Sequence, residues 1–196
     1  MKLFDKWDTS NISVKDPGVR QYINVEPILV PKTCGRNSKV QFWKGKNHIV
    51  ERLINKLMVT GHRGKIHRMR SGNFTGKGIH VYKTVERALE IVEKKLQKNP
   101  VEVFVKAVEN AAPRDEITTI EYGGARYPQA VEMSPQRRID FALRMITQGA
   151  YQRTFRKKTK LVDGLADEIV LAYNMDNKSQ AISKKFELER QADAAR

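Results

Sequence analysis

The chain has 196 residues, a formal net charge of +15 and 40% hydrophobic residues. Its one cysteine, Cys34, excludes a disulfide framework within the chain and a zinc cluster built from thiolates. The N-terminus has no apolar signal core and no apolar run is long enough to span a bilayer, so we expect a cytoplasmic protein with no membrane association.

The beginning of the chain is predicted to be an extension. Residues 1–45 read as partly extended and basic, and residues 46–196 as the RNA-binding helical domain. The extended stretch that starts at Tyr22 is interrupted by Pro27 and Pro31, which exclude a central strand.

A basic loop rich in turn-forming residues follows. Gly35 opens it, and Arg36 and Lys39 are its candidate phosphate contacts. The next aromatic residues, Phe42 and Trp43, could stack on bases or anchor the extension to the core, and the pattern leaves both possibilities open.

Six later segments have helical periodicity. The first is expected to end at Gly61, and Asn99 and Pro100 are expected to begin the third as cap and first-turn residue. Ser134 and Pro135 are expected to cap the fourth, and the last, 178–195, is mostly polar. The core should lie within residues 48–176, on the apolar positions Ile49, Leu53, Leu57, Tyr82, Val85, Leu89, Val92, Leu96, Val101, Phe104, Val105, Val108, Ile139, Ala142, Leu143, Ile146, Leu161, Leu165 and Ile169.

Residues 114–133 change to a strand-like pattern. Gly123 and Gly124 separate two runs rich in Thr, Ile, Tyr and Val, which predicts a two-residue hairpin turn pairing Tyr122 with Ala125. The ribbon either projects as an arm or lies on the helices. The predicted fold class is mainly α: a helical bundle with a protruding two-stranded β-hairpin arm and an N-terminal extension, and the arm tip comprises Tyr122, Gly123, Gly124, Arg126 and Tyr127.

The positive charge is concentrated in particular segments. Residues 61–83 carry six Lys or Arg and no acid, and residues 136–160 carry eight against one acid, Asp140. Such segments favour contact with a polyanion over a generally basic, solvated surface. A DNA-compacting or chromatin-type protein is one alternative, but basic loops rather than one basic helix favour folded RNA.

Catalytic patterns are not found. Residues 72–78 superficially suggest a phosphate loop, but the glycine spacing is short and Gly78 replaces the hydroxyl that would hold magnesium. The histidines 48, 62, 67 and 80 lack carboxylates at metal-ligand spacing. No nucleophile lies beside a base. We therefore expect no enzyme activity, cofactor or metal, which disfavours an RNA-modifying enzyme.

Several long motifs together resemble the small-subunit ribosomal protein seven family, in the archaeal and eukaryotic branch. They are Asn99-Pro-Val-Glu-Val-Phe-Val-Lys-Ala-Val-Glu-Asn110, the Gly123-Gly124 turn, Val131-Glu-Met-Ser-Pro-Gln-Arg-Arg138, and Ala181-Ile-Ser-Lys-Lys185 with Glu187-Leu-Glu-Arg190. The resemblance covers roughly residues 48–196.

The resemblance implies a helical protein that binds the 3′ major domain of small-subunit ribosomal RNA and helps nucleate assembly of the head. It places the arm near exit-site transfer RNA and messenger RNA, beside neighbouring head proteins. Family positions match Lys77, the Arg137 and Arg138 pair, and the Lys184 and Lys185 pair.

Two departures from the family accompany this match. The basic loop over residues 61–78 is longer than in many relatives. Bacterial relatives also have an arginine-rich arm, whereas the basic residues of this arm are only Arg114 and Arg126. Tyr122 and Tyr127 near its tip could stack on bases instead. The complete set of candidate RNA-binding residues is Arg36, Lys39, Arg63, Lys65, Arg68, Arg70, Lys77, Arg114, Arg137, Arg138, Arg153, Arg156, Lys157, Lys158, Lys184 and Lys185.

Overall fold

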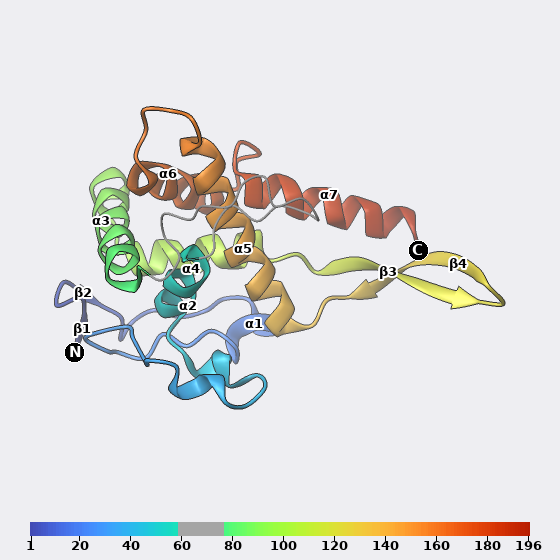
Figure 1. Ribbon diagram of the computed structural model, residues 1–196, viewed down its shortest axis with the longest axis horizontal. Helices are drawn as coiled ribbons and strands as arrows, with labels where there is room; N and C mark the ends of the chain where they lie inside the picture. Colours follow the sequence, from blue (N-terminus) through green and yellow to red (C-terminus); the bar gives the residue numbers. More distant parts are fainter. Residues whose placement is uncertain (59–76) are drawn as a thin grey trace.

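The computed structural model describes residues 1–58 and 77–196, which form a helical body and one long β-hairpin (Figure 1). The helices are α1 (Pro17–Arg20), α2 (Ile49–Leu57), α3 (Gly78–Leu96), α4 (Pro100–Ala111), α5 (Pro135–Thr154), α6 (Leu161–Tyr173) and α7 (Gln180–Ala194). The strands are β1 (Lys2–Leu3), β2 (Trp7–Asp8), β3 (Asp115–Tyr122) and β4 (Ala125–Glu132), and two 3₁₀ turns are η1 (Arg36–Ser38) and η2 (Trp43–Lys46). This confirms the mainly α fold class.

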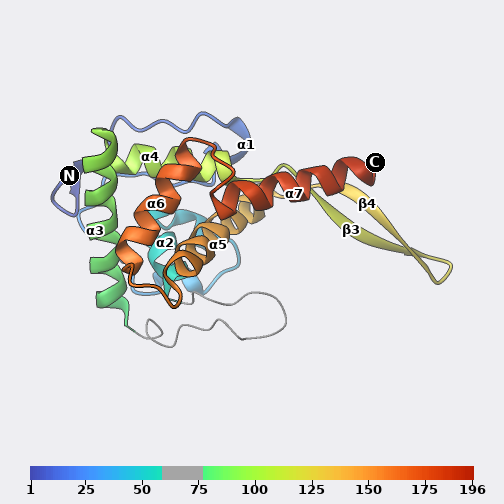
Figure 2. The same ribbon diagram turned by 90° about the horizontal axis from the view of Figure 1, so that it is seen from above.

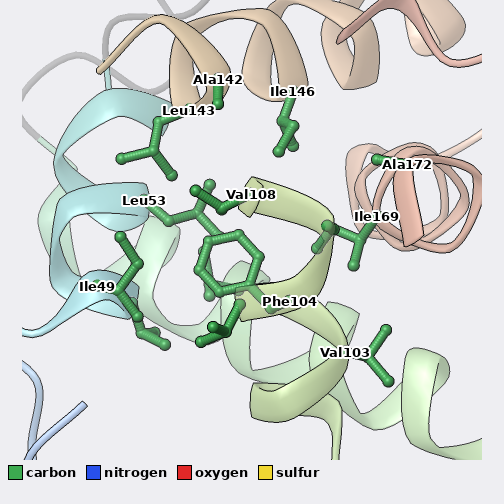
Figure 3. Close-up of a cluster of buried hydrophobic side chains, with 14 of the residues drawn as sticks. Ile49, Leu53, Val103, Phe104, Val108, Ala142, Leu143, Ile146, Ile169 and Ala172 are labelled. Carbon is green, nitrogen blue, oxygen red and sulfur yellow. The ribbon is translucent and has the colours of Figure 1, made fainter. Parts of the chain in front are cut away.

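The core is centred on α4. The ring of Phe104 is fully buried among side chains of α2, α5 and α6, including Leu53, Leu143 and Ile169 (Figure 3). Within each helix the apolar residues recur every three or four positions, so each helix turns one apolar face toward the core. The predicted periodic positions named above are buried, except Tyr82, Leu96 and Leu161, which are partly buried and pack against the core.

Local signals begin α4 as the sequence predicts, whereas Ser134, predicted to cap α5, makes no side-chain capping hydrogen bond. The Asn99 side chain accepts a hydrogen bond from the backbone N–H of Val101 at 3.0 Å, and Pro100 occupies the first turn of α4. His48 caps α2 through Nδ1, and burial lowers the pKa of His48 to about 4. α2 ends at Leu57, and the predicted end at Gly61 lies outside the described residues.

The N-terminal residues are packed against the helices. Leu3, Phe4 and Trp7 are buried, the ring centroids of Phe4 and Tyr82 lie 4.8 Å apart, and Trp7 Nε1 donates to Glu93 at 2.9 Å. The prediction that the core lies within residues 48–176 was therefore too narrow. Without helical periodicity, this segment gave no signal that its apolar residues enter the same core.

The hairpin has the predicted register. Tyr122 pairs with Ala125, and Gly123 and Gly124 have φ of +57° and +82°, which suits glycine in a two-residue turn. The hairpin projects from the helical body. In both views only the end of the hairpin nearest the body lies beside α7 (Figures 1 and 2). The alternative, a hairpin lying flat on the helices, is excluded.

Candidate nucleic-acid interface

The described basic side chains fall into three groups. One group is exposed and has no acidic partner within residues 1–58 and 77–196. A second is exposed but paired with a surface acid, and a third is held inside the fold by carboxylates and backbone carbonyls. Only the first group can meet RNA phosphates without first breaking an intramolecular interaction.

The loop between α5 and α6 belongs to the first group. Arg156, Lys157 and Lys158 are exposed, and so is Lys160, which the sequence interpretation did not select. Arg156 lies over the ring of Phe155 at 5.3 Å, with a left-handed backbone φ of +56°. This turn directs four cations outward from one short segment.

The segment containing η1 and η2 forms a second cluster, which we call the η lobe (residues 35–46). Arg36 and Lys39, two of the predicted RNA contacts, are exposed in it. Residues 27–50 contain no acid and five basic residues: Lys32, Arg36, Lys39, Lys44 and Lys46. Charge counting over this window would have found the cluster, and the sequence interpretation missed its extent.

The single acid of residues 136–160 is neutralised by this lobe. Asp140 accepts from Lys44, and its other oxygen accepts from Arg52 at 3.3 Å. Burial alone would raise the pKa of Asp140, but the hydrogen bond from Lys44 and the charge of Arg52 hold it below its ordinary value. The pair ties the η lobe to α5 and leaves this side of the molecule with a positive excess.

One predicted contact lies at the edge of the described chain. Lys77 is exposed and immediately precedes α3. Four further predicted contacts fall outside the described residues: Arg63, Lys65, Arg68 and Arg70.

Arg138, a predicted RNA contact, belongs to the buried group and is 8% exposed. Its Nε donates to the carbonyl of Pro113 at 2.9 Å and its Nη2 to Asp16 at 2.7 Å. Although burial would raise the pKa of Asp16, the N–H of Gly18 and the Arg138 guanidinium lower it. Arg138 therefore fastens α1 and the start of the hairpin to α5.

Arg153 is also turned inward, although it begins the predicted basic run. Its Nε donates to the fully buried Glu168 at 2.8 Å, and its Nη2 to the carbonyl of Lys178 at 2.6 Å. The other Glu168 oxygen accepts from Ser179 Oγ at 2.8 Å and the N–H of Ala181. One carboxylate thus joins α5, α6 and the start of α7.

The two predicted lysines of α7 make different contacts. Lys185 donates to the carbonyl of Asn110 at 2.9 Å, and burial lowers the pKa of Lys185. Lys184 is more exposed and pairs with Glu187 at 2.6 Å.

The arm has paired charges and exposed rings. Arg137 pairs with Glu116 at 2.7 Å at its base, and Arg126 lies 3.5 Å from Glu121 near the tip. Tyr122 is 82% exposed and Tyr127 58%. Arg114 is exposed at the start of the arm, where its backbone N–H donates to Glu189. The free chemistry of the arm tip is therefore aromatic rather than cationic.

The described chain has neither a metal-binding cluster nor a membrane-spanning helix. No group of three or more His, Cys, Asp or Glu in residues 1–58 and 77–196 is arranged to hold a metal ion. Within the same ranges, no helix has the length and apolar content needed to cross a membrane.

Comparison with known proteins gives full-length matches. The family described as Ribosomal protein S7p/S5e matches residues 19–196. "Small ribosomal subunit protein uS7" of Nanoarchaeum equitans is 51% identical over 196 residues, covering 100% of this chain and 99% of the relative. The proteins of the same name from Methanosphaera stadtmanae and Methanothrix thermoacetophila are 48% and 43% identical, with coverage of 98% or more on both sides.

Proposed function

The chain belongs to the ribosomal protein S7p/S5e family, whose members are structural proteins and not enzymes, and on that premise we propose that it is a constituent of the small ribosomal subunit that binds the 3′ major domain of its RNA. Its place of action is then the ribosome in the cytoplasm, beside other head proteins.

The observation that carries this proposal is the set of exposed, acid-free cations on a rigid helical body. The α5–α6 loop and the η lobe supply Arg156, Lys157, Lys158, Arg36 and Lys39. Phosphate contacts of this kind position a protein on a folded RNA, and loops on several sides suit its irregular shape. A body already held by buried ion pairs can organise the RNA around it, which is the step required to nucleate head assembly.

Competition between nucleic acids tests the RNA assignment. The full chain is bound to a labelled transcript of the 3′ major domain, and unlabelled transcript or duplex DNA of equal length is added. We expect the transcript to compete at a concentration at least about 100-fold lower than DNA, a ratio typical of specific recognition. Equal competition would favour the chromatin-type alternative.

We also propose that the arm reaches the exit-site transfer RNA and the messenger RNA. The projection of the ribbon and the exposure of Tyr122 and Tyr127 at its tip support this, because unpaired bases stack on aromatic rings. The paired state of Arg126 and Arg137 makes stacking the main chemistry of the tip.

Deleting residues 118–129 and closing the gap with a short turn tests the arm. These residues are nearly all exposed, so we expect the melting temperature and incorporation into subunits to stay close to those of the complete chain. Exit-site transfer RNA occupancy in the assembled particles should fall. A steep loss of melting temperature with normal occupancy would contradict the proposal.

A further inference from the structure

A groove of about 750 Å³ lies between the N-terminal residues and the η lobe. Its walls include Tyr22, Phe42, Lys46 and the hydroxyl-bearing Thr9. The groove combines aromatic, polar and cationic groups, and none of these residues takes part in the contacts assigned above.

Phe42 is the most unusual residue of this groove. Its side chain is 67% exposed and its backbone φ is +69°, a left-handed conformation that is unfavourable for a non-glycine residue. The turn is fixed by the N–H of Gly45, which donates to the Phe42 carbonyl at 3.0 Å. The ring is therefore held in solvent rather than packed on the core, which excludes the anchoring alternative for Phe42.

Cations lie on the same lobe as Phe42. Lys46 Nζ lies 4.3 Å from the centroid of the neighbouring Trp43, and Arg36 and Lys39 are exposed on the same lobe. Glu26 is the one acid among the described groove residues, and it lies near Asn24, whose Nδ2 donates to it at 3.4 Å. Phosphates are thus favoured on the Lys46 side, and base N–H groups on the Glu26 side.

The accessible polar groups of the groove differ in character. Lys46 supplies a cationic donor and the Glu26 carboxylate an acceptor, and both residues are exposed. The groove therefore suits a ligand that carries both acceptors and donors. A nucleobase offers both together with a flat π-face, and an apolar peptide side chain offers neither.

We propose that the groove holds one unstacked base of the RNA, stacked on Phe42, with its phosphates beside Lys46 and the η lobe cations. This deepens the RNA-binding function proposed above and rests on it. It gives the N-terminal part of the chain a recognition role in addition to its packing role.

The test separates stacking from charge by salt titration. Phe42→Ala and Phe42→Gly are bound to the 3′ major domain transcript at several salt concentrations. Loss of one stacked base is expected to lower affinity about 10-fold at every salt concentration, with the slope of log affinity against log salt unchanged. Phe42→Tyr retains a ring and should bind as the unchanged chain does.

One variant controls for misfolding and another controls for the loss of any exposed ring. Glycine accepts the positive φ of position 42, so Phe42→Gly should keep the turn and the melting temperature. Phe186→Ala removes another partly exposed ring, on α7, and should leave RNA affinity unchanged.

Each remaining outcome overturns the stacking proposal. Unchanged affinity of both Phe42 variants would show that no base stacks in the groove. If the unchanged chain still prefers the transcript over duplex DNA, the proposed RNA-binding function would remain. Normal RNA affinity with failed incorporation into subunits would assign the groove to a neighbouring protein. A lower salt slope would show that the substitution disturbed phosphate contacts instead.

Discussion

Replacing Arg156, Lys157 and Lys158 together by alanine is expected to weaken binding to the 3′ major domain transcript on the order of 100-fold at about 0.1 M salt. All three side chains are exposed without an acidic partner in the described chain, so their charges are available to phosphates. If each meets one phosphate, the slope of log affinity against log salt should fall by about two to three units. Binding isotherms between about 0.05 and 0.3 M salt measure both quantities.

A charge-matched variant is the control for this experiment. Lys6, Lys95 and Lys106 already pair with Glu86 and Glu90, Asp167 and Glu109, respectively. Replacing these three lysines removes the same charge from the total of +15 but leaves the free cations in place. Equal losses in both variants would mean that net charge alone, and not the α5–α6 loop, determines affinity.

Glu168→Ala is expected to lower the free energy of unfolding by about 3–5 kcal/mol, because it leaves Arg153 and Ser179 without the buried carboxylate that they share. The Glu168 carboxylate is fully buried and accepts from both Ser179 and the N–H of Ala181 at the start of α7. Urea unfolding measures the loss, and hydrogen exchange should show α7 opening before α4.

The neighbouring residue of the same helix provides the control. Asp167 is an exposed carboxylate that pairs with Lys95, and surface pairs contribute at most about 1 kcal/mol. Asp167→Ala should therefore change stability by less than about 1 kcal/mol. A similar small effect for Glu168→Ala would show that the junction of α5, α6 and α7 is held by packing alone.

The features predictable from sequence were those fixed by local rules. Two adjacent glycines specify a two-residue turn, and the turn sets the pairing of Tyr122 with Ala125 and of every pair behind it. The helix positions followed from the spacing of apolar residues, because α4 must bury its apolar face whichever helix it packs against. These rules act over a few residues, so no knowledge of the tertiary structure was required.

The features missed were those that depend on distant partners. Arg138 looked like Arg137 in sequence, yet one pairs with Asp16, 122 residues earlier, and the other with Glu116 on the arm. Arg153 headed a basic run, but Glu168 turns it inward. Charge counting identifies how many cations a segment has, and only the fold decides which of them are free.

The attachment of the first residues to the body has a consequence for synthesis. Trp7 donates to Glu93, which is 86 residues further along, and Leu3 and Phe4 are covered by the same helical body. At about 5–20 residues per second, Trp7 waits roughly 4–17 s for that partner to be made. Chains that stop before α3 therefore leave these apolar side chains uncovered, and covering them marks a chain that has been synthesised past α3.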